Sequence, residues 1–452
     1  MWVEELSIEN IRCFESQRLR FANGENRYPW VTFLSENGGG KSTALQALGL
    51  LLAGPEGAQK LLPRPLGWLR NEDDPGKIGA RIHQDDRDPG QHGTDKIRRA
   101  FAYSYILTGS QSLTVNNKLY TEPSVVPASA GRKVLSWLRQ NAFASKGTGW
   151  FSAGYGAFRR LTRSTQVIVP SLEPQARFTN FTTQFDESEP LSVFERWMVY
   201  LDYRIAKNND QKAQKQREMG IRAINRVLPE DAEFHSVTPE GRILFDIGGE
   251  RVPTISLSDG YRSILALAGD LIWRLILAFP GSADPLLEKG VVLIDELDIH
   301  LHPKWQREVP TVLRQIFPHL QFFVATHSPL VAAGAGEDAL TLRFNFHDGR
   351  STVEKVENMA AMNVDRILQS DAFGLLSTYS PQTEYKIQRY DALTRKGRRR
   401  TAEENDELRP LLKFMNEACP VGGTPDPESL EGRVDQLLEE KLRDQSCQTA
   451  ET

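Results

Sequence analysis

The chain has 452 residues, of which 25% are charged and 40% hydrophobic, and its formal net charge is −4. This composition predicts a folded protein with a sizeable core and excludes a polycation, so any nucleic-acid surface must be a local patch. Three scattered cysteines exclude a disulfide framework and indicate a reducing compartment. The N-terminus has no signal-peptide core, and the longest apolar segment, 264–279, is interrupted by Asp270 and Arg274. We therefore expect a cytoplasmic protein without a membrane anchor.

The first predicted unit is a strand, a glycine-rich loop and a helix. Residues 3–12 alternate as in a strand, 30–35 (WVTFLS) form a short β-rich run, and STALQALGLLLAG has helical spacing that closes on Gly54. The loop SENGGGKST (35–43) matches the P-loop pattern G-x-x-x-x-G-K-S/T with one departure. Ser35 stands where the first glycine is expected, which is acceptable if the backbone φ there is ordinary.

The residue types of this loop suit the binding of phosphate groups. Consecutive glycines let several backbone N–H groups converge on phosphate oxygens, and the positive end of the following helix points into the loop. Lys41 adds a cation, and Ser42 offers a hydroxyl to Mg²⁺. The predicted nucleotide-binding residues are Asn37, Gly38, Gly39, Gly40, Lys41, Ser42 and Thr43.

The middle of the chain is predicted to be an insertion of strands and helices. Residues 71–95 are rich in Asp, Gly and Pro and read as loops around a short strand. Strands are expected at 100–108 and 165–169, helical structure at 190–227, and a hairpin at 233–256.

A hydroxyl-rich loop, SLSDGYRS (256–263), comes directly before a long apolar helix. Such a loop at a helix start can present a Ser hydroxyl and free N–H groups to an anion. The alternative interpretation is an ordinary N-cap of a core helix, and the two are compatible.

Acidic side chains end the apolar strand at 290–294 (GVVLI). Asp295 and Glu296 follow it directly, and Mg²⁺ is the natural partner of Asp295, while Glu296 can polarise an attacking water. The alternative is a strand end that meets a polar loop. His300 and His302 alternate further on, but no other residue of ligand spacing lies near them.

A helix at 303–317 and a strand at 320–325 follow, and the strand leads into Thr326, His327 and Ser328. If this strand lies beside the one at 290–294, the His327 imidazole can reach the terminal phosphate of a nucleotide in the P-loop. The alternative for a single histidine is a structural or exposed side chain.

In this order, the P-loop, the LSDGY loop (257–261), the Asp-Glu strand end and the histidine resemble the head of ABC-type ATPases. The resemblance implies an α/β fold with a mixed sheet around a P-loop core, an antiparallel β subdomain, a helical insertion and a C-terminal helical extension. It also implies ATP and Mg²⁺ as cofactors. The implied roles are Ser42 and Asp295 on the metal, Glu296 and His327 in catalysis, and Ser258 and the Gly260 backbone on the nucleotide of a partner protomer.

The N-terminal strand ELSIENIRCF resembles the RecF, SMC and OLD group of such ATPases. Segments at 151–161, 182–201 and 364–384 are similar to the PtuA ATPase family of Septu and retron-associated defence systems. This implies an anti-phage ATPase that forms a head-to-head homodimer, can assemble further, and controls a separate HNH nuclease, PtuB. The alternatives are a RecF-like, ATP-gated DNA-binding clamp and an AriA-type defence ATPase with a Toprim partner.

The predicted domains are an ATPase head at 1–345 with an insertion at about 71–289, a helical partner-binding region at 346–419, and a linker with a terminal helix at 420–452. Residues 330–452 contain no DxD motif, so we expect no nuclease of the OLD type in this chain. Thr401 and Glu404 form a predicted capping box.

Two basic clusters and a glutamine complete the candidates. Phe158, Arg159 and Arg160, and the run RKGRRR at 395–400, are candidate contacts for nucleic acid or a protein partner, although a charge run is more often a solvated face. Gln84 is a candidate for the glutamine that couples such a site to the insertion.

Overall fold

The computed structural model describes residues 1–418 apart from positions 25, 85–87, 89–99, 110–112, 116–117, 121, 144–148, 160–175, 187–192, 230–231, 239, 371 and 376. The chain divides into two compact units between Gly374 and Leu375. The predicted strand at 165–169 and the predicted linker and terminal helix at 420–452 lie outside the described residues.

A six-stranded sheet forms the centre of the first unit, in the order β11-β15-β16-β5-β17-β18. Its first five strands are parallel, and β18 pairs with β17 in the antiparallel sense. The central strands are buried on both faces, which explains why they read as uninterrupted apolar runs. The strands are β5 (Trp30–Leu34), β11 (Phe151–Tyr155), β15 (Gly290–Ile294), β16 (Leu320–Thr326), β17 (Leu340–His347) and β18 (Arg350–Val356).

A five-stranded antiparallel sheet has the order β10-β7-β6-β1-β2. Its strands are β1 (Trp2–Ile11), β2 (Phe14–Arg20), β6 (Gly76–His83), β7 (Ala100–Thr108) and β10 (Ser124–Pro127). Smaller sheets are formed by β3 (Ala22–Asn23) with β4 (Asn26–Arg27), by β8 (Leu113–Val115) with β9 (Lys118–Tyr120), and by β12 (Ala232–Val237), β13 (Ile243–Ile247) and β14 (Glu250–Pro253). The hairpin predicted at 233–256 is thus a three-stranded sheet.

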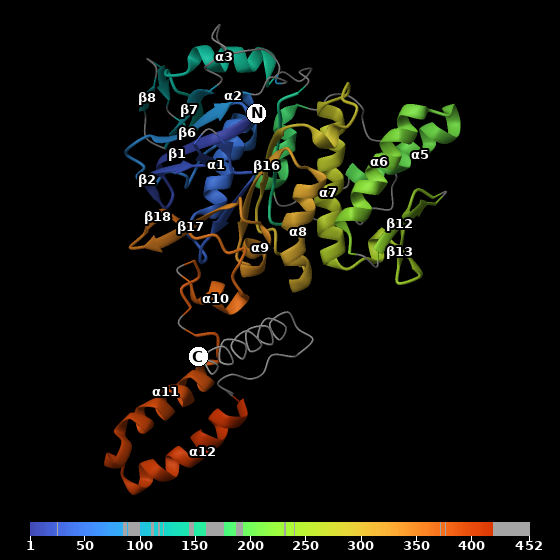
Figure 1. The fold of residues 1–452 in the computed structure, drawn as a ribbon. Coiled ribbons are helices and arrows are strands. Elements are labelled where there is room, and N and C mark those ends of the chain that lie inside the picture. The colour runs from blue at the N-terminus through green and yellow to red at the C-terminus, as the bar shows by residue number, and fades with distance from the viewer. Residues whose placement is uncertain are drawn as a thin grey trace, which may run out of the picture. The chain divides into compact units, whose positions relative to one another are not determined.

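The helix that follows the P-loop, α1 (Lys41–Ala53), belongs to a core that both large sheets share (Figure 1). Nearly all of its residues are buried, so it shows no polar face. The other helices of the first unit are α2 (Pro55–Leu61), α3 (Arg132–Asn141), α4 (Thr182–Phe185), α5 (Val193–Asn208), α6 (Gln211–Val227), α7 (Asp259–Ala278), α8 (Pro303–Ile316), α9 (Pro329–Gly334) and α10 (Val364–Gln369). Short 3₁₀ turns occur at Arg177–Phe181, Thr254–Ser256 and Pro285–Leu287.

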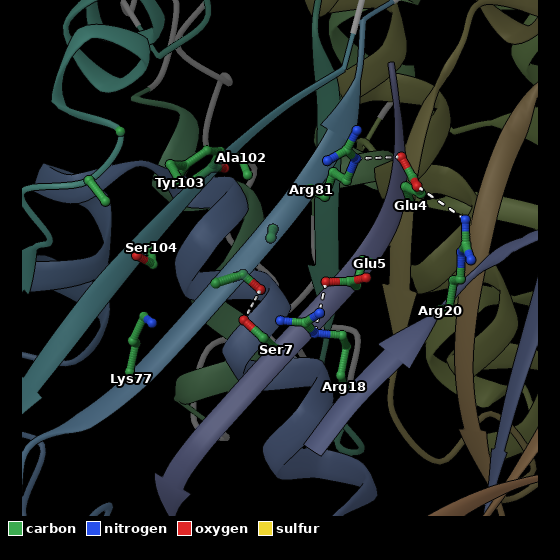
Figure 2. Close-up of a pocket in the computed structure, with 14 residues that line it drawn as sticks. Glu4, Glu5, Ser7, Arg18, Arg20, Lys77, Arg81, Ala102, Tyr103 and Ser104 are labelled. Carbon is green, nitrogen blue, oxygen red and sulfur yellow. Dashed lines mark hydrogen bonds and ion pairs between the residues drawn. The ribbon is translucent and has the colours of Figure 1, made fainter. Parts of the chain in front are cut away.

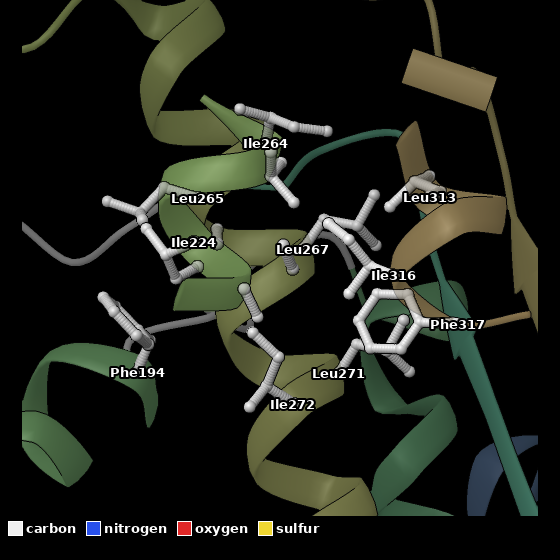
Figure 3. Close-up of a cluster of buried hydrophobic side chains, with 14 of the residues drawn as sticks. Phe194, Ile224, Ile264, Leu265, Leu267, Leu271, Ile272, Leu313, Ile316 and Phe317 are labelled. Carbon is white, nitrogen blue, oxygen red and sulfur yellow. The ribbon is translucent and has the colours of Figure 1, made fainter. Parts of the chain in front are cut away.

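A second core surrounds α7, the apolar helix after the hydroxyl-rich loop. Figure 3 shows its side chains, including Leu267 and Leu271, packed with Leu313, Ile316 and Phe317 at the end of α8. The helices α5 and α6 add further apolar residues to this core. These layers confirm the predicted class, a mixed α/β fold with a P-loop sheet, an antiparallel sheet and helices.

The predicted head boundary at 345 falls within a pair of strands. Residues 340–347 and 350–356 form the hairpin of β17 and β18, so the six-stranded sheet continues past 345.

The second unit contains the helices α11 (Pro381–Lys396) and α12 (Ala402–Ala418), joined through a 3₁₀ turn at Gly397–Arg399. The capping box is confirmed, because the Glu404 N–H donates to Thr401 Oγ1 at 3.2 Å and the Thr401 N–H donates to Glu404 Oε2 at 3.0 Å. Among the described residues, no helix has the length and hydropathy of a membrane span.

A buried charged group ties α7 to the sheet. Asp270 is fully buried and accepts hydrogen bonds from the Tyr155 hydroxyl, at 2.9 Å, and from Arg274 Nε, at 2.5 Å. Removal of one partner from such a buried pair leaves the other charge without compensation.

Asp270→Ala is therefore expected to lower the free energy of unfolding by about 3–5 kcal/mol, because Arg274 and the Tyr155 hydroxyl stay buried without their acceptor. Urea-induced unfolding measures this change. Arg139→Ala is the control, since it removes an exposed ion pair with Glu56 and should have a small effect. Equal stability of the two variants would contradict a structural role for Asp270.

Candidate nucleotide site

The P-loop joins β5 to α1 in the conformation that its glycines require. Gly38 and Gly40 have φ values of 81° and 98°, which a side chain disfavours. A Cβ atom on Gly39 would lie 2.5 Å from Ser35 Oγ, and one on Gly40 would lie 2.6 Å from Cys13 Sγ. Ser35 is not among the residues with positive φ, so its replacement of the first glycine is accommodated as predicted.

Lys41 is held at the centre of this loop. Its ammonium group donates to Ser35 Oγ at 2.8 Å and to the Ser35 carbonyl at 3.2 Å. Burial lowers the pKa of Lys41 to about 8, although the acidic side chains nearby, Asp295 first among them, act in the opposite direction. The hydroxyl of Ser35 therefore gives the lysine an acceptor that a glycine would not.

His327 lies beside Lys41, at the P-loop where the sequence predicted that its imidazole could reach a phosphate. The Lys41 Nζ atom is 3.0 Å from His327 Nε2, which accepts if the ring carries its proton on Nδ1. Burial and the positive charge of Lys41 both lower the pKa of His327 below its ordinary value. The histidine is brought here because β16, which precedes it, is the parallel neighbour of β5.

The predicted carboxylate of the metal site lies at the same sheet edge, because the carboxyl ends of adjacent parallel strands meet. Asp295 is 8% exposed, and its Oδ1 atom has no hydrogen-bond partner among the described residues, while the nearby Ser42 side chain acts to lower the pKa of this carboxyl group. Burial raises its pKa. A buried carboxylate with a free oxygen, next to a hydroxyl, fits the hard oxygen ligands that Mg²⁺ prefers.

Glu296, the next residue, has an unusual backbone. Its φ is 47°, a left-handed conformation that is uncommon outside glycine and often occurs at functional sites. Its side chain is partly exposed, at the end of a buried strand. It therefore lies next to the proposed metal ligand and remains open to solvent.

The sequence placed Arg159 wrongly among exposed basic contacts. The structure shows it 4% exposed, donating to the carbonyl oxygens of Gly156, Asp295 and Glu296. A short run of basic residues does not show that the loop after β11 folds over the end of β15, because this contact joins segments that are far apart in the sequence. Phe158 remains exposed, and Arg160 lies outside the described residues.

Asp298 was missed as a functional candidate. It accepts hydrogen bonds from the Thr326 hydroxyl and, at 3.3 Å, from the backbone N–H of His327. The sequence did contain a signal for this residue, because Asp298 is the third acid of the motif DELD. Asp298 connects the segment after β15 to the residue that follows β16, so it fixes the backbone of His327.

The LSDGY loop presents only part of itself to solvent. Ser258 and Asp259 are exposed at the start of α7, and the Ser258 hydroxyl makes no capping hydrogen bond. Gly260 is buried, and a Cβ there would lie 2.6 Å from the His300 carbonyl oxygen, so only glycine fits. Among the described residues, no hydrogen bond joins Ser258 to the P-loop.

The structure also places three further candidates from the sequence, namely His302, Gln84 and the basic run at 395–400. His302 caps α8 by accepting from the Lys304 N–H at 3.3 Å, and the described residues contain no group of three potential ligands that would make His302 a metal site. Gln84 is buried directly after β6. Within the basic run at 395–400, Lys396 pairs with Glu404 and Arg400 donates to the Leu393 carbonyl, so these two side chains stabilise the second unit.

Two hollows differ in their relation to this site. One, of about 260 Å³, is lined by Ser35, Asn37 and His327 and so adjoins the P-loop. The other, of about 570 Å³, lies on the five-stranded sheet, and Figure 2 shows that its arginines pair with Glu4 and Glu5. The second hollow contains none of the predicted nucleotide residues.

Residues 36–333 match the family described as "AAA domain, putative AbiEii toxin, Type IV TA system", and the chain belongs to this family. The match contains the P-loop from Glu36 onward, the LSDGY loop, Asp295, Glu296 and His327. The chain therefore contains an AAA domain, and this domain carries the motifs in the order on which the resemblance to ABC-type ATPases was based.

Among curated proteins, the chain is similar to Septu protein PtuA of Bacillus mycoides (strain KBAB4), with 25% identity over 94% of this chain and 52% of the relative. It is also similar to the "Retron Vc95 probable ATPase" of Vibrio cholerae serotype O1 biovar El Tor, with 31% identity over 33% of this chain and 29% of the relative. The "Retron Ec83 probable ATPase" of Escherichia coli is 44% identical over 20% of this chain and 16% of the relative. The chain thus spans about half the length of the first of these relatives, and less of the others.

A solved SMC head bound to the C-winged helix domain of ScpA aligns with a TM-score of 0.48 and 14% identity, over 80% of this chain and 99% of that one.

His327 is expected to remain neutral at pH 7, because burial and Lys41 both disfavour its protonation. NMR titration of histidine labelled at Cε1 should give a pKa below 6.5, and Lys41→Met should raise it by removal of the neighbouring positive charge. A wild-type pKa above 6.5 would contradict the described environment.

Proposed function

We propose that this chain is the ATP-binding and ATP-hydrolysing subunit of a bacterial anti-phage defence complex. The observation that carries the proposal is the grouping of Lys41, Ser42, Asp295 and His327 at one sheet edge, with a buried carboxylate oxygen left without a partner among the described residues. This arrangement suits a polyanion bound together with a divalent cation.

The chain's own residues have separate tasks in this proposal. The P-loop N–H groups and Lys41 bind the phosphates. The His327 side chain, which lies next to Lys41, contacts the terminal phosphate. Ser42 and Asp295 would hold Mg²⁺, which supplies neutralisation of the charge that develops on the phosphates. Glu296 orients the attacking water and accepts its proton, for which its partly exposed carboxylate is suited.

The exposed part of the LSDGY loop supports a shared site. Ser258 and Asp259 lie at the N-terminus of a long helix, where free N–H groups favour an anion, and within the described chain Ser258 has no hydrogen bond to the P-loop. We propose that a second copy supplies this loop to the nucleotide, so that two heads close face to face around two ATP molecules.

The biological role rests on similarity to proteins named as Septu PtuA and as retron ATPases. We propose that closure and opening of the dimer control a separate HNH nuclease. The second unit offers α11 and α12 as a docking element, because among the described side chains of this helix pair only Leu393 is buried.

Glu296→Gln is expected to lower ATP turnover by about 10²–10⁴-fold while ATP affinity stays near the wild-type value, because proton acceptance is lost and the phosphate contacts are kept. Phosphate release and binding of a fluorescent ATP analogue measure the two effects, and light scattering should show an ATP-dependent dimer. Lys41→Ala is the contrasting variant and should lose binding. Normal turnover by Glu296→Gln would show that another group accepts the proton.

A mixture of Ser258→Arg and Lys41→Ala proteins tests whether the site is shared. Each variant alone should be inactive, whereas a mixed dimer contains one composite site with an intact P-loop and an intact Ser258. Part of the ATPase activity should therefore return on mixing. A mixture as inactive as its components would indicate a site contained within one protomer.

A further inference from the structure

The loop after β11 closes over the end of β15 through one side chain. Arg159 Nη1 donates to the Gly156 carbonyl at 2.8 Å and to the Asp295 carbonyl at 2.6 Å, and Nη2 donates to the Glu296 carbonyl at 2.9 Å. The Asp295 N–H donates in turn to the Tyr155 carbonyl at 2.9 Å. The backbone of Asp295 is thus fixed on both sides by the segment 155–159.

A buried guanidinium is expensive, so its position needs a physical reason. Desolvation of a charge is tolerated when hydrogen bonds and a favourable field compensate it. Three carbonyl oxygens accept from Arg159, and the nearby acids Asp295, Asp298 and Glu296 provide an attractive field. The planar guanidinium can serve several acceptors at once, which a lysine ammonium on a flexible stem does less well.

The carbonyl that Arg159 holds belongs to the residue with the unusual backbone. Glu296 adopts a φ of 47°, and such a conformation persists where the surroundings fix it. Without Arg159, the Glu296 carbonyl would keep, among the described residues, the hydrogen bond from the Ile299 N–H at 3.2 Å, and the Leu297 N–H of the same peptide group would keep the Ala325 carbonyl at 3.2 Å. A change there would redirect the Glu296 carboxylate without altering the P-loop.

We propose that Arg159 is a positioning residue for ATP hydrolysis, which holds the Asp295 and Glu296 peptide groups so that the Glu296 carboxylate meets the attacking water. The inference rests on the proposed ATPase function. Arg159 thus affects the rate of ATP hydrolysis, whereas the P-loop determines the affinity for the nucleotide.

The test compares Arg159→Lys and Arg159→Ala with wild type and with a matched control, Arg177→Ala. Arg177 is also partly buried and also donates to two carbonyls, those of Gly149 and Trp150, but these precede the opposite end of β11. For each protein, ATP-analogue affinity, single-turnover rate and melting temperature are measured in the full chain.

Both Arg159 variants should lose about 10–100-fold in the rate of hydrolysis, as is typical when support of a functional group is removed, while ATP affinity changes by less than about threefold. Arg177→Ala should lose stability but retain the turnover of each folded molecule. The Lys variant keeps the charge, so it keeps the comparison valid if the Ala variant does not fold.

Wild-type turnover in a folded Arg159→Lys or Arg159→Ala protein would overturn the inference, as would a loss of ATP affinity that matches the loss of rate. Equal loss of turnover in Arg177→Ala would also overturn it, because the effect would then be general destabilisation. A wild-type protein that binds but does not hydrolyse ATP would instead refute the proposed function.

Discussion

Burial of charge at the carboxyl edge of the parallel sheet is the constraint on which the site depends. The same desolvation lowers the pKa of Lys41 and raises that of Asp295, so the folded protein opposes the charged form of each. The chain offsets part of this cost for Lys41 with hydrogen bonds to the Ser35 hydroxyl and the Ser35 carbonyl. In the proposed nucleotide complex, phosphate groups and a divalent cation would supply the opposite charges at the same place, which is why this edge suits a nucleotide.

The shape of the P-loop depends on segments far from it in the sequence. The Ser351 hydroxyl on β18 donates to the Gly39 carbonyl at 2.6 Å, and the Ser351 N–H donates to the Cys13 carbonyl at 2.9 Å. Cys13 also lies against Gly40, where a side chain would collide with it. The turn between β1 and β2 and the last strand of the central sheet thus hold the loop from two sides. The strand β18, which lies beyond the predicted head boundary at 345, therefore contributes to the P-loop.

The sequence predicted what is local and missed what is long-range. The P-loop, the Asp-Glu pair and His327 are short patterns that end apolar strands, so their strand and helix context could be read directly. Arg159 and Ser351 carry no such pattern, because the Asp295 carbonyl that Arg159 binds and the Gly39 carbonyl that Ser351 binds are each more than a hundred residues away. The placement of Arg159 was wrong for a physical reason: adjacent aromatic and basic residues suggest exposure, whereas the backbone carbonyls at a strand end can hold an arginine in the interior.

A chain of contacts within one protomer joins the exposed LSDGY loop to Asp295 and Glu296 at the end of β15. The α7 helix begins at the LSDGY loop, packs Gly260 against the His300 carbonyl, and binds the Tyr155 hydroxyl through Asp270. Tyr155 ends the strand that leads to Arg159, and Arg159 holds the carbonyls of Asp295 and Glu296. A shift of α7 along its axis would separate Tyr155 from its only hydroxyl acceptor among the described residues, or would move β11 with it. Because a buried hydroxyl without its acceptor is costly, movement of β11 is the favoured response, and a partner that engages Ser258, as proposed above, would thereby act on Asp295 and Glu296 of the same protomer.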